Sequence, residues 1–209
     1  MTLSARAFGS ISVRTPLAQP GQRIGIMGGS FNPVHAGHLI VAEAALKRLG
    51  LDQLWWVVTP GNPLKENSGL APLAVRMTAC RALAKNPRMK ITGFETELGS
   101  PYTSVTLRFL KRRYPACHFV WVMGADNLAT FHRWQNWEDI ASSMPIAVVD
   151  RPGWRLKALA SEAAKVLSDV RVPEAKAETL VGLQAPAWVF LTTRLSGLSS
   201  TALRNRRSP

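Results

Sequence analysis

Short apolar runs alternate with segments of helical periodicity along almost the whole chain, and this alternation limits the possible folds more than any other feature. The first unit is an apolar run at 24–27, followed by two glycines and then by apolar residues at helical spacing over 38–49. A strand, a glycine turn and a helix are predicted there. Further strands are expected at 54–58, 89–94, 118–123, 146–149 and 188–191, and further helices at 72–85, 103–113, 126–140, 156–167 and from 199 onward.

Such alternation is typical of an α/β fold with a Rossmann-like, mostly parallel sheet that carries helices on both faces. Folds of this kind bind ligands at the carboxyl ends of their strands. The 209 residues are enough for a single domain with a sizeable core. We expect this domain to span 23–209, preceded by a disordered basic extension over 1–22, which contains no acidic residue and shows no clear period.

The chain is strongly basic, with 26 Lys and Arg against 13 Asp and Glu and a formal charge of +13. Such an excess is compatible with nucleic acid, an anionic membrane or small phosphorylated ligands. The basic run 111–113 is expected to form the solvated last turn of a helix rather than a nucleic-acid-binding arm. No apolar run approaches the roughly 18 residues of a membrane span. Cys80 and Cys117, the only cysteines, suit a reducing compartment. We therefore expect a cytoplasmic protein that binds phosphates, with neither nucleic acid nor a membrane as its partner.

The segment 28–38, with the sequence GGSFNPVHAGH, joins the first predicted strand to the first predicted helix. Its adjacent glycines, Gly28 and Gly29, would let a ligand approach the backbone, and the following helix would direct unpaired N–H groups at it. His35 and His38 are three residues apart and fall on one face of the helix, so both can donate to the same phosphate. An anion is the expected occupant.

Three other interpretations of this segment fit less well. Its glycines, together with Gly25, do not give the G-x-G-x-x-G pattern of dinucleotide-binding proteins. A zinc site would need a third ligand, and the only other histidines are His118 and His132. A purely structural turn would explain the glycines but not the two polar histidines beside them.

A second polar cluster lies near the end of the chain, where Ser199, Ser200 and Thr201 precede Arg204. The commonest role of such a serine is to cap a helix N-terminus. Hydroxyl groups, unpaired N–H groups and a guanidinium together also form a cradle suited to a polyphosphate. The sequence is compatible with both roles.

With both motifs in place, the chain resembles the nucleotidylyltransferase superfamily, whose signatures are H/T-x-G-H after the first strand and a late S-S-T-x-I/L-R. Within it, the chain is similar to the bacterial nicotinate-nucleotide adenylyltransferases, whose G-G-S-F-N-P-x-H-x-G-H motif it matches. The segments 101–103, 124–126 and 150–153, and Trp134 ten residues after Gly124, match the family's mononucleotide-binding segments. One departure is Leu64, where many members carry a histidine before the lysine that corresponds to Lys65. The resemblance spans about 23–207.

The resemblance implies a reaction in which ATP transfers its adenylyl group to nicotinate mononucleotide, giving nicotinate adenine dinucleotide and pyrophosphate in NAD biosynthesis. Mg²⁺ is expected to be held by phosphate oxygens and water, because neither motif contains clustered carboxylates. The residue roles that follow are catalytic for His35, His38, Lys65 and Arg204, ATP-binding for Gly28, Gly29, Ser30, Phe31, Gly37, Ser199, Ser200 and Thr201, and mononucleotide-binding for Asn32, Tyr102, Thr103, Asp126, Trp134 and Arg151.

Several alternatives stay open at the level of the sequence. The same chemistry could serve another acceptor, such as nicotinamide mononucleotide, pantetheine phosphate or a cytidylyltransferase substrate, and a basic nucleic-acid-binding module would also explain the charge. Trp134 and Trp137 have the spacing of a core stripe as well as of a stacking pair. Thr103 could be a helix N-cap, and Arg151 could form a surface salt bridge.

Overall fold

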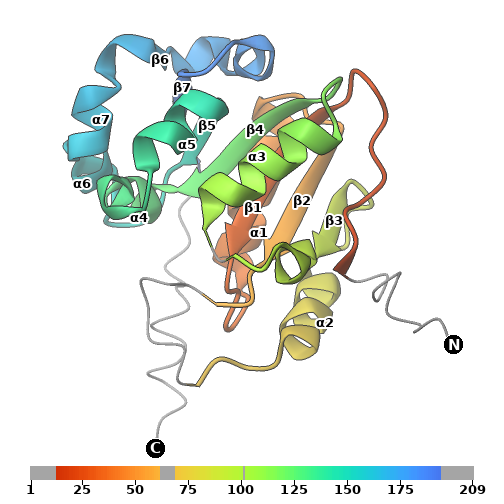
Figure 1. Ribbon diagram of the computed structural model, residues 1–209. Coiled ribbons are helices and arrows are strands. Elements are labelled where there is room, and N and C mark those ends of the chain that lie inside the picture. The colour runs from red at the N-terminus through yellow and green to blue at the C-terminus, as the bar shows by residue number, and fades with distance from the viewer. Residues whose placement is uncertain (1–12, 62–68, 101, 194–209) are drawn as a thin grey trace, which may run out of the picture.

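Seven parallel strands form one sheet in the order β3-β2-β1-β4-β5-β7-β6 (Figure 1). This computed structural model describes residues 13–61, 69–100 and 102–193. Every strand pairing in it is parallel. The expected α/β class is confirmed, and the sheet is wholly rather than mostly parallel. The strands are β1 (Arg23–Gly29), β2 (Gln53–Val58), β3 (Met89–Thr92), β4 (His118–Gly124), β5 (Ile146–Val149), β6 (Arg171–Val172) and β7 (Trp188–Leu191).

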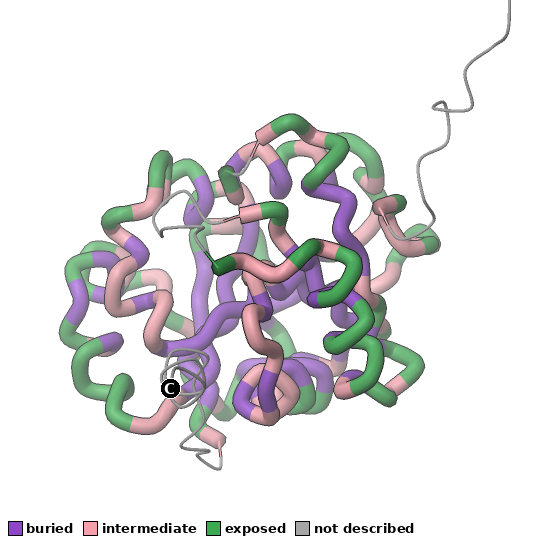
Figure 2. The backbone as a smooth tube through the Cα atoms, turned by 90° about the horizontal axis from the view of Figure 1, so that it is seen from below, coloured by how far each residue is buried: buried purple, intermediate pink, exposed green. Residues whose placement is uncertain are grey.

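Helices cover both faces of the sheet, so that its apolar residues contribute to two separate cores. One face carries α1 (Ala36–Arg48), α2 (Leu73–Leu83) and the 3-10 helix η6 (Glu174–Gly182). The other face carries α3 (Thr103–Arg113), α4 (Ala125–Leu128), α5 (Trp137–Ser143), α6 (Arg155–Leu159) and α7 (Glu162–Val166). Shorter 3-10 helices are η3 (Phe94–Leu98), η4 (Phe131–Arg133) and η5 (Ser168–Val170). Seen from below, the buried residues run through the middle of the molecule, with exposed residues around them (Figure 2).

The central strands are continuous apolar runs because each of them faces a core on both sides. In β2, Trp55 packs into the core beneath α3, and its neighbour Trp56 packs into the core beneath α1. Gly50 ends the first helix with a φ of 59°, the left-handed backbone that glycine adopts without strain. The strand and helix boundaries around α1 therefore follow directly from the local sequence.

Two helices that the sequence predicts as continuous are broken. The segment 126–140 forms α4, η4 and α5, and Asn136 adopts a positive φ of 56° immediately before α5. The segment 156–167 forms α6 and α7, because Ser161 starts a new helix by accepting a hydrogen bond from the N–H of Ala164. The prediction also missed β6 and η6, and the helix expected from 199 lies outside the described residues.

Part of the predicted N-terminal extension packs against the domain. Residues 14–22, here called the N-terminal strap, bond to segments far away in the sequence. The Thr15 hydroxyl lies 2.6 Å from the Tyr114 hydroxyl, Thr92 donates to the carbonyl of Arg14 at 2.7 Å, and the N–H of Gly21 donates to the carbonyl of Ala116 at 2.7 Å. The strap therefore contacts the domain at Tyr114, Thr92 and Ala116, and residues 1–12 lie outside the described part. Among the described residues, the structure contains no helix of the length and apolarity that crossing a bilayer would need.

Candidate active site

The strand order reverses between β1 and β4, because the chain moves outward from β1 to β2 and β3 and then returns to the other side of β1. In open α/β sheets the ligand crevice lies at such a reversal, outside the carboxyl ends of the strands. The predicted phosphate-binding turn follows β1, Asp126 follows β4, and Arg151 follows β5. The fold thus brings three predicted segments to one edge of the sheet.

The two histidines form the N-terminal cap of α1. His35 is the N-cap residue, and its Nδ1 accepts a hydrogen bond from the N–H of Gly37 at 3.1 Å. The backbone N–H of His35 in turn donates to Nδ1 of His38 at 3.2 Å. This reciprocal arrangement brings the two ring centroids within 3.9 Å of each other. The expectation that both rings share one face at the helix start is confirmed.

Both imidazoles are neutral at physiological pH. Burial, helped by the positive charge of Arg151, lowers the pKa of His35 to about 4, and burial together with the nearby His35 and Arg151 lowers the pKa of His38 to about 3. Because each Nδ1 accepts an N–H, each neutral ring carries its proton on Nε2. Nε2 of His35 is buried and has no hydrogen-bond partner among the described residues. A phosphate oxygen would supply the missing acceptor.

Aromatic rings support the turn that follows β1. Phe31, at a positive φ of 48°, stacks on Trp56 with a centroid distance of 5.2 Å and meets the His38 ring edge-on at 5.0 Å. A Cβ at Gly28 would lie 2.7 Å from Cη2 of Trp121, so this glycine is also required by packing within the sheet. The sequence analysis had assigned it only to ligand approach.

The side chain of Asn32 binds the segment before α2. Its Nδ2 donates to the carbonyl of Gly69 at 3.1 Å, and its Oδ1 accepts from the N–H of Ala71 at 3.4 Å. Asn32 was expected to contact the mononucleotide. Both ends of its amide bond to the chain that enters α2, and the contact with the mononucleotide stays a prediction.

Asp126 and Arg151 form an ion pair across the ends of β4 and β5, with 3.3 Å between Oδ2 and Nη1. The salt bridge considered for Arg151 is therefore present, and it lies near His35, since the charges of both residues act on the pKa of that imidazole. Oδ1 of Asp126 is buried and unpaired among the described residues. A Cβ at Gly124 would clash with that oxygen and lie 2.7 Å from Cδ of Arg151, so this ion pair requires a glycine at position 124.

The remaining acceptor-site candidates lie at helix starts. Because Tyr102 is the N-cap residue of α3, Thr103 is the first helical residue and not the N-cap. The Tyr102 side chain is 36% exposed. Trp134 meets Phe131 edge-on at 5.4 Å, and Trp137 does so at 5.7 Å. Both tryptophans are half-buried against the core, so packing accounts for part of each ring.

Five predicted site residues lie outside the described part of the chain, namely Lys65, Ser199, Ser200, Thr201 and Arg204. Their convergence with the histidines stays a prediction. Among the residues that are described, no three of the His, Cys, Asp and Glu side chains are grouped as a metal site would require.

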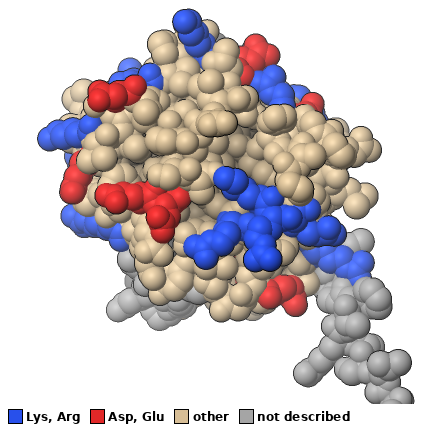
Figure 3. All heavy atoms as spheres, turned by 45° about the horizontal axis from the view of Figure 1, so that its top comes forward, with Lys and Arg blue, Asp and Glu red and all other residues tan. Residues whose placement is uncertain are grey.

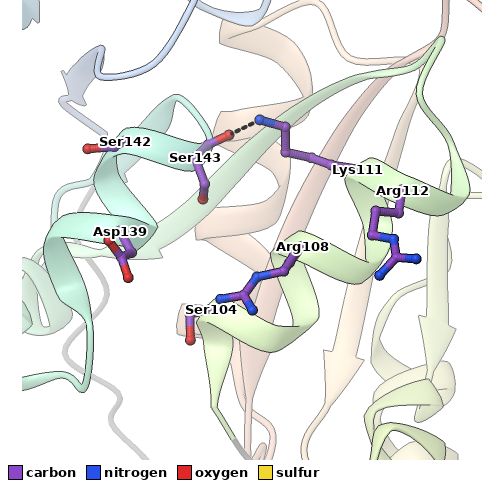
Figure 4. A pocket seen from close by; sticks show the side chains of 7 residues that line it. All are labelled: Ser104, Arg108, Lys111, Arg112, Asp139, Ser142 and Ser143. Carbon is purple, nitrogen blue, oxygen red and sulfur yellow. Dashed lines mark hydrogen bonds between the residues drawn. The ribbon is translucent and has the colours of Figure 1, made fainter.

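A polar hollow of about 450 Å³ lies between α3 and α5. Lys and Arg side chains gather into a patch on one face of the molecule (Figure 3). In the hollow, Lys111 donates to the carbonyl of Ser143 at 2.9 Å, Arg108 points toward Ser104, and Arg112 points away from α5 (Figure 4). These cations diverge, and Asp139 faces them from α5. The solvated basic last turn expected at 111–113 is thus confirmed, without a converging anion site.

Comparison with known proteins shows the family to which the chain belongs. The cytidylyltransferase-like family model matches residues 26–206. The chain is 58% identical over 184 residues to the "Probable nicotinate-nucleotide adenylyltransferase" of Methylorubrum extorquens, covering 88% of this chain and 100% of that one. The chain belongs to the nicotinate-nucleotide adenylyltransferase family. A member from Rhizobium meliloti is 56% identical over 185 residues, covering 88% of this chain and 98% of that one. The expected family is therefore confirmed.

Solved structures support the fold of this adenylyltransferase at much lower sequence identity. Plasmodium falciparum nicotinic acid mononucleotide adenylyltransferase complexed with NaAD matches with a TM-score of 0.66 and 17% identity. The match covers 88% of this chain and 83% of the parasite protein. The complex of that protein with APC matches with a TM-score of 0.67. The Rossmann-like arrangement of the sheet is confirmed by these similarities.

Arg76 is not singled out by the sequence analysis, and Gly124 lies in a matched segment without an expected role of its own. Arg76 reaches the turn after β1 from α2, and Gly124 makes room for the ion pair of Asp126 and Arg151. A signal for Arg76 was present, because it falls on the same helical stripe as Leu73, Met77 and Cys80 and thus within the apolar face of α2. Nothing in the sequence marks the room needed at Gly124.

Proposed function

We propose that this enzyme transfers the adenylyl group of ATP to nicotinate mononucleotide, forming nicotinate adenine dinucleotide and pyrophosphate in NAD biosynthesis. The observation that carries the proposal is the pair of neutral imidazoles at the start of α1, with an unpaired Nε2–H donor at the strand-order reversal. The names of its relatives specify the same acceptor.

In the proposed reaction, a phosphate oxygen of the mononucleotide attacks the α-phosphorus of ATP in line, and pyrophosphate leaves. The attacking oxygen is already anionic at neutral pH, so the chain needs no general base. Its task is to hold two anions together and to stabilise the charge that develops on the transferred group. His35 and His38 donate Nε2–H to the α-phosphate oxygens, and neutral donors do so without changing their protonation during the step.

ATP is assigned to the turn after β1 and the start of α1. Exposed backbone N–H groups and the positive end of the helix dipole favour its phosphates there. Lys65 and Arg204 are proposed to hold the triphosphate and the leaving pyrophosphate. The other ATP-binding residues in this proposal are Gly28, Gly29, Ser30, Phe31, Gly37, Ser199, Ser200 and Thr201.

Nicotinate mononucleotide is assigned to the other side of the crevice. The exposed Tyr102 and the adjacent Thr103 would contact its ring carboxylate or ribose, and the half-buried face of Trp134 would stack on its pyridine ring. Arg151 would bind its phosphate, oriented by Asp126. Asn32 would act from the turn, through the segment that it holds.

Magnesium is proposed to be held by phosphate oxygens and water, because the carboxylate of Asp126 is already ion-paired and no cluster of acids lies among the described residues. When bound, the metal would neutralise charge on the triphosphate. The residues of this chain would orient the two substrates around it.

The test is to incubate the protein with ATP, Mg²⁺ and one acceptor at a time and to measure pyrophosphate release. We expect nicotinate mononucleotide to give product at a kcat/KM at least tenfold above nicotinamide mononucleotide or pantetheine phosphate. Product from another acceptor alone would reject the assigned substrate and keep the chemistry. Binding to duplex DNA that weakens steeply with salt, with no pyrophosphate from any acceptor, would favour the nucleic-acid-binding alternative.

A further inference from the structure

Arg76 is a buried cation at the carboxyl edge of the sheet. It lies on α2 with 3% of its surface exposed. Its Nε donates to the carbonyl of Ala71 at 2.7 Å, and its Nη1 donates to the carbonyls of Ser30 at 2.7 Å and Thr59 at 2.8 Å. In the part of the chain that is described, no carboxylate lies within ion-pair distance of this guanidinium.

The three carbonyls belong to three different segments. Ser30 begins the turn after β1, Thr59 follows the end of β2, and Ala71 precedes α2. The side chain of Asn32, in the same turn, also bonds to the segment 69–71. One guanidinium therefore fixes the turn after β1 against both neighbouring segments.

A buried guanidinium without an acidic partner is costly, because its charge is removed from water. A smaller apolar residue would pack at this helix position at lower cost if α2 only had to cover the sheet. The fork-shaped group does what an apolar side chain cannot, since it donates hydrogen bonds in two directions to carbonyls of three segments. Its location beneath the phosphate-binding turn indicates a functional reason for this cost.

We propose that Arg76 is a positioning residue for ATP, which holds the turn at Ser30 and Phe31 in the arrangement that receives the triphosphate. This inference rests on the proposed placement of ATP at that turn. Arg76 acts through the backbone that it holds and does not itself touch the substrate.

The test compares Arg76→Lys and Arg76→Met with Arg112→Met, a matched substitution at an exposed position of α3. Steady-state KM for ATP, KM for nicotinate mononucleotide and kcat are measured below the melting temperature of each variant. For Arg76→Met we expect KM for ATP to rise about tenfold or more, in line with the loss of charged hydrogen bonds. KM for nicotinate mononucleotide should change by less than about twofold. Arg76→Lys, which keeps the charge and part of the bonding, should lie between Arg76→Met and the wild type, and Arg112→Met should match the wild type.

A lower melting temperature with unchanged KM for ATP would overturn the inference and leave Arg76 a structural residue. Equal increases in both KM values would overturn it as well. If neither Arg76 variant folds, the ¹⁵N resonance of the Arg76 Nε–H in the wild type decides. It should shift on addition of a non-hydrolysable ATP analogue but not of nicotinate mononucleotide, and no shift with the analogue rejects the proposal. If His38→Ala loses activity while Arg76→Met keeps the wild-type KM for ATP, only this inference is rejected. Full activity in His38→Ala would reject the proposed ATP site itself.

Discussion

The imidazoles at the start of α1 act as hydrogen-bond donors rather than as charges. Their Nδ1 atoms are occupied by backbone N–H groups, and burial keeps their pKa values far below neutrality. The sequence placed His35 and His38 side by side but left their protonation undecided, because protonation depends on burial and on Arg151, which is distant in the sequence. The side-chain pattern near the site was thus predictable, and its electrostatics required the fold.

His38→Ala should lower kcat by about 10²–10³-fold, by analogy with the removal of one oxyanion-hole donor. The fold should persist, since the substitution removes one capping interaction worth about 1 kcal/mol. Pyrophosphate release gives the rate, and circular dichroism checks the fold. Near-wild-type turnover would remove His38 from the catalytic role.

Glu95 has a raised pKa, whereas the pKa values of the two histidines are lowered. It is 3% exposed, its Oε1 accepts a hydrogen bond from the Thr106 hydroxyl at 2.6 Å, and burial raises its pKa to about 7. The folded state therefore holds a proton that the unfolded state, with a pKa of 4.5, releases, so stability falls as pH rises from 4.5 to about 7. Between these pH values the free energy of unfolding should fall on the order of 3 kcal/mol through Glu95, and Glu95→Gln should abolish this decrease.

Denaturant unfolding of wild type and Glu95→Gln at several pH values isolates this contribution, because the other titrating groups cancel in the difference. A difference that does not change between pH 4.5 and 7.5 would show that the Glu95 carboxyl titrates normally.

At the scale of elements, the strands were predictable and the interruptions of the helices were not. Strands buried on both faces read as continuous apolar runs, as in β2. The break between α6 and α7 depends on Ser161 capping a new helix. A serine within a helical pattern can equally lie inside one continuous helix, so the sequence does not predict the break. The strand β6 has only two residues, and its pairing with β7 comes from the rest of the sheet rather than from its own sequence.

Gly124→Ala tests how closely the ends of β4 and β5 approach. The added Cβ would displace Asp126 and Arg151, so KM for nicotinate mononucleotide should rise about tenfold, equivalent to about 1.4 kcal/mol, while KM for ATP changes little. Gly182→Ala is the matched control, because a Cβ there meets nothing within 4 Å. Equal KM values for nicotinate mononucleotide in wild type and Gly124→Ala would show that the ion pair does not contribute to acceptor binding.

For the whole molecule, the α/β class and the edge that carries the site followed from the order of strands and helices. The position of β4 beside β1, and hence the strand-order reversal, did not, because it arises from pairing between residues 95 positions apart in the sequence. Burial of both histidines couples the site to global stability. At pH 5 an unfolded imidazole with a pKa of 6.5 is protonated, whereas the folded ones stay neutral.

The free energy of unfolding should therefore fall by about 2 kcal/mol for each of these two histidines between pH 7 and pH 5. A double substitution, His35→Asn with His38→Asn, should remove this component, as measured by denaturant unfolding at both pH values. An equal pH dependence in the variant and the wild type would show that the imidazoles are protonated in the native protein.

The N-terminal strap bears on how this protein can be shortened. It bonds through Thr15 and the carbonyl of Pro16 to Tyr114, whose ring meets Trp55 edge-on. Removal of residues 14–22 would expose the Tyr114 ring to solvent and favour self-association. A fusion or crystallisation variant is therefore better started upstream of Arg14.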